Sequence, residues 1–138
     1  MYVLYQTYNI EKGEIGEIKD LLSDRIKLLS GKDKLLMTMY IEKGNSFRQI
    51  AALAGVDETN ISRRIRKLTK RLIEGKYIKC LQNRDKFNAN ELTVAKEYFM
   101  TGMSIRKIAN KHRITKYRVY KILQKIQQII GTIQEKEN

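Results

Sequence analysis

The sequence predicts an all-α protein in which two tandem copies of a three-helix unit follow an N-terminal amphipathic helix. Three observations support this prediction. The 138 residues include no proline and only eight glycines, so long stretches are free to be helical. Apolar residues recur at spacings of three and four along most of the chain. The second half also repeats the pattern of the first half at an offset of 58 residues.

The first half is expected to contain four helices, each with an apolar face and a defined end. The first is the N-terminal amphipathic helix at 14–30, which Gly31 would stop. The others are expected at 33–43, 46–54 and 58–72, and they end near Gly44, Gly55 and Gly75. Residues 2–8 are expected to form a short strand or an extended arm.

The second half is expected to repeat the last three of these helices, at 90–101, 104–111 and 116–133. The stretch at 77–89 is less periodic, which indicates a linker. The expected organisation is therefore an N-terminal arm and helix at 1–31, a first unit at 32–76, the linker at 77–89 and a second unit at 90–138.

The internal repeat is more specific than a shared alternation of polar and apolar residues. Of the 29 pairs from Tyr40/Tyr98 to Leu68/Ile126, seven are identical. Besides the tyrosine pair they are Gly44/Gly102, Ser46/Ser104, Arg48/Arg106, Ile50/Ile108, Ala51/Ala109 and Lys67/Lys125. A chance match of two amphipathic helices would supply apolar pairs but not shared glycine, serine and arginine. Two copies of one unit is the simplest interpretation.

Within each copy the spacing is that of a helix-turn-helix. In the first copy the small Ala51 permits two helices to cross closely, and Gly55 permits a left-handed turn. Val56 is expected to plug the corner, while Ile61 and Ile65 seat the second helix on the first. The polar positions left exposed on that second helix include Glu58, Thr59, Ser62, Arg63 and Arg66.

The second copy departs from the first at its turn. Arg113 stands where the first copy has Gly55, so this turn must either strain or adopt a different geometry. The second helix of this copy exposes Lys116, Tyr117, Arg118, Tyr120, Lys121 and Gln124. One of the two tyrosines is expected to pack while the other contacts a base or sugar, with the assignment left open, and His112 is expected to lie on the surface near the turn.

The first copy resembles a family of DNA-binding modules. Its sequence MYIEKGNSFRQIA at 39–51, followed by GVD at 55–57, Ile61 and RRIRKL at 63–68, is similar to the fourth region of bacterial sigma factors and to LuxR-type modules. Those modules show an aromatic residue, an acidic residue and a glycine before the first helix, Ile-Ala inside it, and an arginine-rich recognition helix. The resemblance covers about 45 residues in each copy.

The resemblance implies binding in the DNA major groove at a promoter element, together with contact to RNA polymerase. By motif position it implies base-facing roles for Glu58, Thr59, Ser62, Arg63 and Arg66, and phosphate contacts for Arg48, Arg64 and Lys67. In the second copy the residues expected to bind DNA are Arg106, Lys116, Tyr117, Arg118, Tyr120, Lys121, Gln124 and Lys125. The chain has no room for the other regions of a sigma factor and carries the module twice, so we expect a stand-alone DNA-binding protein.

Charge and composition agree with a polyanionic partner. The formal net charge is +13, and it rises from 0 in residues 1–32 to +4 in 33–75 and +9 in 76–138. Charge alone does not separate DNA, RNA and anionic membrane. One cysteine cannot form an internal disulfide, and one histidine gives no cluster of metal ligands. No membrane-length apolar run, signal sequence, catalytic constellation or phosphate-binding loop is apparent, so we expect a cytoplasmic protein that is not an enzyme and needs no cofactor.

These observations together predict sequence-specific binding of double-stranded DNA along two neighbouring stretches of major groove, with a role in transcription regulation. Three alternatives stay open at this point: a sigma-like partner of RNA polymerase, a DNA-targeting accessory subunit of a phage or mobile element, and a protein-interaction bundle without affinity for nucleic acid. The N-terminal helix is expected either to pack on the first unit or to form a homodimer contact.

Overall fold

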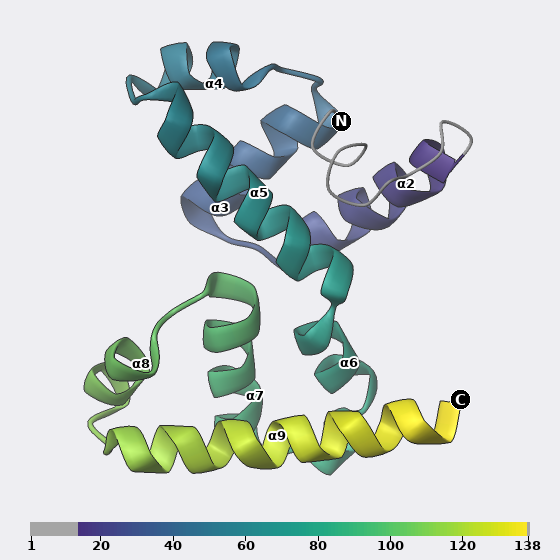
Figure 1. The fold of residues 1–138 in the computed structure, drawn as a ribbon, viewed down its shortest axis with the longest axis vertical. Coiled ribbons are helices and arrows are strands. Elements are labelled where there is room, and N and C mark those ends of the chain that lie inside the picture. The colour runs from purple at the N-terminus through teal and green to yellow at the C-terminus, as the bar shows by residue number, and fades with distance from the viewer. Residues whose placement is uncertain (1–13, 138) are drawn as a thin grey trace. The chain divides into compact units, whose positions relative to one another are not determined.

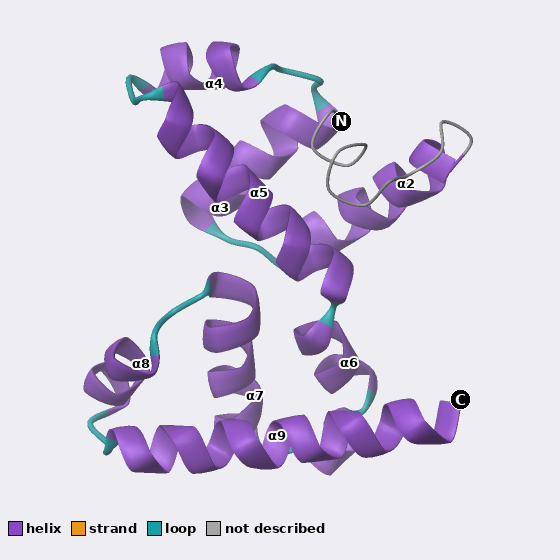
Figure 2. Cartoon of the chain, viewed as in Figure 1, coloured by secondary structure: helices purple, strands orange, loops and turns teal. Residues whose placement is uncertain are grey.

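The computed structural model describes residues 14–137, and side chains as far as Gln134, so the strand or arm expected at 2–8 lies outside the described residues. From 14 to 137 the chain is helical and contains no strand, which confirms the all-α prediction (Figure 2). The chain divides into two compact units with the boundary after Ile73. Each unit buries apolar side chains of its own helices.

The described part of the first unit contains α-helices and one π-helical segment, coloured purple to teal in Figure 1. These are α2 (Ile15–Ile26), α3 (Gly31–Met37), η2 (Thr38–Glu42), α4 (Phe47–Ala54) and α5 (Glu58–Glu74). The side chains of Leu22, Met37, Ile50 and Ile65 are completely buried, so each α-helix contributes to one core.

Helix α2 belongs to this core. Leu22 and Ile26 are at most 1% exposed, so the apolar face of the helix is used inside the unit. The neighbouring Arg25 donates from Nη1 to the backbone oxygens of Leu72 at 2.5 Å and Ile73 at 3.3 Å, which satisfies carbonyls near the end of α5. The expected packing on the first unit is therefore what the structure shows, and the homodimer contact stays a prediction.

The second unit contains α6 (Lys76–Gln82), the 3₁₀ turn η3 (Arg84–Lys86), α7 (Ala89–Ala95), the π-helical η4 (Lys96–Thr101), α8 (Ile105–His112) and α9 (Lys116–Glu137). In Figure 1 these are the green and yellow helices together with α6. Helix α9 contacts α6, α7 and α8, so it forms the spine of this unit. Its buried side chains include Val119, Leu123, Ile126 and Ile130.

The structure corrects the prediction of a linker at 77–89. Most of it forms α6 and η3, and its apolar residues Tyr77, Cys80 and Phe87 are buried. Helix α6 contacts α7, η4 and α9, so it is part of the second unit. Tyr77 and Cys80 are three residues apart on α6, but a helix of seven residues is too short to show a clear period, and Phe87 lies beyond it. Burying these side chains fixes the segment against its neighbours.

The same 58-residue offset relates α6 to α2, and the repeat therefore comprises four helices rather than the three predicted. Leu22 corresponds to Cys80, and both side chains are completely buried. Ser30 corresponds to Asn88, and these residues occupy the N-cap positions of α3 and α7. Helix α2 contacts η2 as α6 contacts η4, so the corresponding elements have corresponding neighbours.

Each unit also interrupts a predicted α-helix with a π-helical segment at the same place. The helices expected at 33–43 and 90–101 begin as α3 and α7 and end as η2 and η4. The backbone N–H of Asn45 donates to Met39 at 3.0 Å, and that of Met103 donates to Glu97 at 2.8 Å. Both pairs lie 58 residues apart in sequence, so the wide turn is a property of the repeated unit.

The two tight turns that follow have the same backbone geometry. Gly55 ends α4 with φ 68° and ψ 30°, and Arg113 ends α8 with φ 55° and ψ 44°. The next residue donates its backbone N–H five positions back in each case, from Val56 to Ala51 and from Ile114 to Ala109. Of the two alternatives for Arg113, the structure shows strain, because a residue with a Cβ atom occupies the left-handed region.

One predicted core residue is wrong. Val56 is 48% exposed and does not plug the corner of the first turn. Ile50, Ala51 and Ile61 are buried there, and they leave the valine side chain facing outward. The small side chain of Ala51 lets α4 and α5 cross closely, so the helices fill the corner without the side chain of Val56.

Candidate nucleic-acid interface

The outward side of α5 is polar and basic. Ile61, Ile65 and Leu68 are buried on one side of the helix. Residues offset from them by about half a turn point the other way. These outward residues are Thr59, Arg63 and Arg66, and all three are exposed. Neither arginine has an ion-pair partner among residues 14–134. We call Thr59, Arg63 and Arg66 the first stripe.

The outward side of α9 carries a second stripe at the matching positions, formed by Tyr117, Lys121 and Gln124. It lies opposite the buried Val119 and Leu123. The Lys121 Nζ atom lies 5.5 Å from the centroid of the Tyr117 ring, which is cation–π distance. The second stripe is therefore polar, aromatic and free of acidic groups.

The two tyrosines of α9 are both exposed, at 68% for Tyr117 and 53% for Tyr120. Neither ring is therefore buried in the core. Tyr120 instead borders an open groove of about 430 Å³ with Tyr98, Ile105 and Gln124. Tyr117 points directly outward, whereas Tyr120 lies at the edge of the stripe.

Most of the other predicted site residues are exposed as well. These are Arg48, Glu58, Lys67, Arg106, Lys116, Arg118 and Lys125, while Ser62 is half-buried. Arg48 and Arg106 stand in the first turns of α4 and α8. Each follows a serine N-cap whose hydroxyl accepts a backbone N–H at 3.1 Å, Ser46 in the first unit and Ser104 in the second. The capped turns hold the backbone that carries these arginines.

Arg64 is different from its neighbours, because its guanidinium is engaged inside the first unit. Nε donates to Asp33 Oδ1 at 2.8 Å, and Nη2 donates to Asp33 Oδ2 at 2.5 Å. This bidentate ion pair joins α3 to α5. We therefore leave Arg64 out of the candidate interface, although the sequence placed it among the phosphate contacts.

Lys125, which stands at the position of Lys67 in the repeat, makes a similar ion pair in the second unit. Its ammonium lies 2.7 Å from Oε2 of the buried Glu91, on α7. Burial raises the pKa of Glu91, but the hydrogen bonds from Lys125 and from the Asn88 backbone outweigh it and hold the pKa below its usual value. Glu91 and Asp33 lie 58 residues apart. In each unit an acidic residue at the same repeat position therefore links its helix, α3 or α7, to the helix that carries the stripe, α5 or α9.

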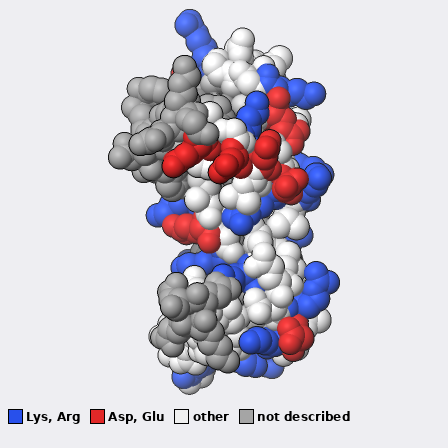
Figure 3. Space-filling model, turned by 90° about the vertical axis from the view of Figure 1, so that its right-hand side faces the viewer, with Lys and Arg blue, Asp and Glu red and all other residues white. Residues whose placement is uncertain are grey.

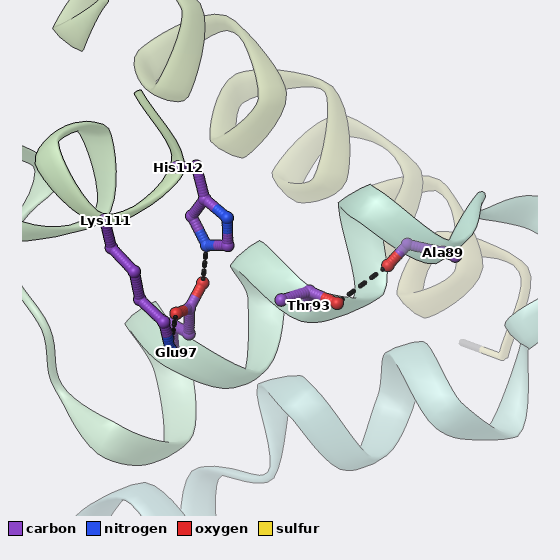
Figure 4. A network of polar contacts seen from close by, with 5 residues as sticks. All are labelled: Ala89, Thr93, Glu97, Lys111 and His112. Carbon is purple, nitrogen blue, oxygen red and sulfur yellow. Dashed lines mark hydrogen bonds and ion pairs between the residues drawn. The ribbon is translucent and has the colours of Figure 1, made fainter. Parts of the chain in front are cut away.

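A polar network that sequence reasoning missed supports the second unit (Figure 4). Glu97 is 6% exposed and accepts from His112 Nε2 at 2.6 Å, while Lys111 Nζ lies 2.7 Å from its other oxygen. One turn earlier, Thr93 donates to the backbone oxygen of Ala89 at 3.0 Å. Burial raises the pKa of Glu97, but the two basic partners outweigh it and lower the pKa overall.

A signal for this network was present in the repeat. Where the first copy has Met39, Leu53 and Ala54, the second has Glu97, Lys111 and His112. Three apolar residues are replaced together by one acid and two bases, which is the pattern expected of groups that meet in space. His112 lies on the surface near the turn, as expected, and it also pairs with the buried Glu97.

Acidic side chains are unevenly distributed over the surface. On the face drawn in Figure 3, the first unit shows more acidic surface than the second. Helix α2 of the first unit carries three exposed acidic residues, Glu17, Asp20 and Asp24. The second unit has the larger basic excess of the two, as the charge of +9 in residues 76–138 requires. This favours the second unit as the stronger attractor of a polyanion.

Other kinds of site find little support among the residues that the structure describes. They contain no group of three or more His, Cys, Asp or Glu side chains suited to holding a metal ion. Cys80 is completely buried, and burial raises the pKa of its thiol to about 11, which opposes nucleophilic chemistry. No helix within the described ranges has the length and apolar character needed to cross a membrane.

Comparison with known proteins adds no relative: the chain matches no protein-family model, and neither a curated protein nor a solved structure shows significant similarity to it.

Proposed function

We propose that this chain binds double-stranded DNA sequence-specifically through two tandem helix-turn-helix units and acts in transcription regulation. One observation carries the proposal. In both units an exposed polar stripe lies on the helix that follows a capped helix and a left-handed turn, α5 after α4 and α9 after α8. This is the position from which a recognition helix enters the major groove.

The dimensions of the two helices suit this role. At 1.5 Å per residue, the 17 residues of α5 extend roughly 25 Å, and the 22 residues of α9 extend further. A major groove about 12 Å wide admits an α-helix. The first turns of α5 and α9 carry the stripe residues nearest the preceding turn, where recognition helices contact base edges.

The charge of the interface supports phosphate contacts around the groove. Arg48 and Arg106 occupy equivalent exposed positions on the helices that precede α5 and α9. Lys67 and Arg118 are further exposed cations of the outward helices. Contacts of this type position a protein on the duplex and make affinity fall steeply with salt. Base-facing roles would belong to the two stripes.

The proposal is tested by selecting bound duplexes from a random pool with the full chain, at low and at moderate salt. We expect a preferred site with two elements about one helical turn, roughly 34–36 Å, apart. Affinity for that site, measured by fluorescence anisotropy, should fall when Arg63 or Lys121 is replaced by alanine. Lys86→Ala is the matched control, since Lys86 is exposed on η3, outside both stripes.

Three results would contradict the proposal or part of it. Absence of duplex binding at low salt contradicts the proposal and favours a protein-interaction bundle. Binding to core RNA polymerase in the absence of DNA would favour the sigma-like alternative. Unchanged affinity in both alanine variants, with unchanged helicity by circular dichroism, would remove α5 and α9 from the interface.

A further inference from the structure

We infer that the two units read unlike base sequences, the first an element containing guanine and the second an element rich in A·T pairs, so that the bound site has no two-fold symmetry. This inference rests on the proposed function, because it concerns the same two helices. It goes further by assigning a base preference to each unit.

The repeat permits a comparison of the stripes position by position. Thr59 corresponds to Tyr117, Arg63 to Lys121 and Arg66 to Gln124. All six side chains are exposed, and each stripe lies opposite the buried side of its own helix. Equivalent positions in the two units therefore face the same way relative to their unit's turn.

The scaffold of the unit is kept between the copies while the stripe is not. Buried positions exchange one aliphatic residue for another, as in Ile61/Val119 and Ile65/Leu123. The cation in the first turn of the preceding helix is identical, Arg48 and Arg106. No stripe pair is identical. The units thus share one cation placed to contact the phosphate backbone and differ at every stripe position that would face the bases.

The first stripe has the chemistry that recognises guanine. A guanidinium donates two parallel hydrogen bonds to O6 and N7 of guanine, which is the commonest specific contact in the major groove. Arg63 and Arg66 both point outward and are exposed. Their neighbour Arg64 is held by Asp33, so the fold separates a structural arginine from two that remain for the ligand.

The second stripe has the chemistry that recognises A·T pairs. The amide of Gln124 can both donate and accept, which matches N7 and the N6 amino group of adenine. The exposed ring of Tyr117 offers an apolar surface for the methyl group of thymine. The ammonium of Lys121 lies 5.5 Å from the centroid of that ring. Unlike the guanidinium of Arg63, which stands at the matching position, it is a single point charge and cannot donate a bidentate pair of hydrogen bonds to guanine.

The test exchanges the two side chains at one matched position. Arg66→Gln gives the first stripe the amide of the second, and Gln124→Arg does the reverse. Base preference of the full chain is measured by selection from a random duplex pool, followed by competition titrations on single-base variants of the selected site. Lys86→Gln is the control for loss of one exposed charge outside the stripes.

We expect the wild-type site to contain one guanine-bearing and one A·T-rich element. Arg66→Gln should change the preference at one position of the first element from guanine to adenine, and Gln124→Arg should change one adenine of the second to guanine. Each switch should alter relative affinity by about tenfold or more. Lys86→Gln should leave both elements unchanged. Arginine and glutamine are both good helix formers, so helicity should be unaffected.

Two results would overturn the inference. If the selected elements are identical, or if the two exchanges alter no base preference, the units do not divide the site as stated, while DNA binding itself stands. If the wild-type chain binds no duplex even at low salt, the proposed function fails and this inference fails with it. The wild-type titration therefore separates the two failures.

Discussion

Arg113 adopts the left-handed backbone conformation of Gly55, the residue 58 positions before it. The φ and ψ angles are 55° and 44° at Arg113, against 68° and 30° at Gly55. For a residue with a Cβ atom this region is disfavoured by about 1–2 kcal/mol, whereas glycine enters it freely. The second unit keeps the turn at a cost in stability that the first unit avoids, and this difference leads to two predictions of opposite sign.

Gly55→Ala should lower the free energy of unfolding by about 1–2 kcal/mol. No atom lies within 4 Å of the position that a Cβ atom would take, so the loss arises from the backbone conformation alone. Urea denaturation followed by circular dichroism measures it. Gly16→Ala in α2 is the control: that position is equally open but helical, and alanine there should leave stability unchanged or raise it by up to about 1 kcal/mol.

Arg113→Gly should raise the free energy of unfolding by about 0.5 kcal/mol. Relief of the left-handed strain exceeds the entropy that glycine adds to the unfolded chain. The matched control is Arg106→Gly, an exposed arginine in the first turn of α8, where glycine should lower the free energy of unfolding by up to about 1 kcal/mol. Equal losses in the two variants would show that the arginine backbone at 113 is not strained.

The helix ends near the first of these turns could be predicted from the sequence. Gly44, Gly55 and the N-cap Ser46 act locally, so the ends of the helices around them were predictable from residue type. The exposed polar side of α5 and α9 followed from helical spacing, which depends only on residue order. The all-α class and the stripes are therefore consequences of local pattern.

What the sequence could not supply depends on contacts between distant residues. The ion pair that engages Arg64 needs Asp33, 31 positions away, and nothing in the run of arginines indicates which of them has an acidic partner. The stretch at 77–89 was expected to be a linker because its apolar pattern is less periodic, and a buried thiol such as that of Cys80 is a weak signal of a core residue. The Arg64–Asp33 ion pair and the burial of α6 both depend on packing between distant residues, which the periodicity of the sequence does not reveal.

The network around Glu97 predicts an acid sensitivity of the second unit. The folded-state pKa of Glu97 is lowered, so the carboxylate adds stability that is fully present above the ordinary glutamate pKa of about 4.3. This contribution is lost as the pH falls through the lowered pKa. Thermal melts between about pH 7 and pH 3 should therefore show stability declining toward acid pH.

Glu97→Gln should remove part of this pH dependence and lower the free energy of unfolding at pH 7 by about 1–3 kcal/mol, because Lys111 and His112 lose their carboxylate acceptor. Glu42→Gln is the control, since Glu42 is exposed and should leave both quantities unchanged. A Glu97→Gln variant with the same stability and pH profile as the wild type would mean that the network contributes nothing to the fold.

Arg63 and Arg64 are adjacent in sequence, yet the structure predicts that their alanine variants fail in different assays. Arg64→Ala breaks the bidentate pair with Asp33 and should lower the free energy of unfolding by about 1 kcal/mol, with little change in DNA affinity. Arg63→Ala removes an exposed side chain of the first stripe, so stability should stay within about 0.5 kcal/mol of the wild type. Its affinity for the selected duplex should fall.

Measuring DNA affinity as a function of salt concentration separates the roles of the arginines further. Loss of a phosphate-contacting cation reduces the slope of log affinity against log salt by about 1, whereas loss of a base contact relaxes preference at one position. We expect Arg63→Ala to relax the base preference and Arg48→Ala to reduce the slope, while Arg64→Ala does neither. If Arg64→Ala instead weakens binding as much as Arg63→Ala at unchanged stability, Arg64 leaves Asp33 to engage DNA, and the division between structural and DNA-facing arginines on α5 is wrong.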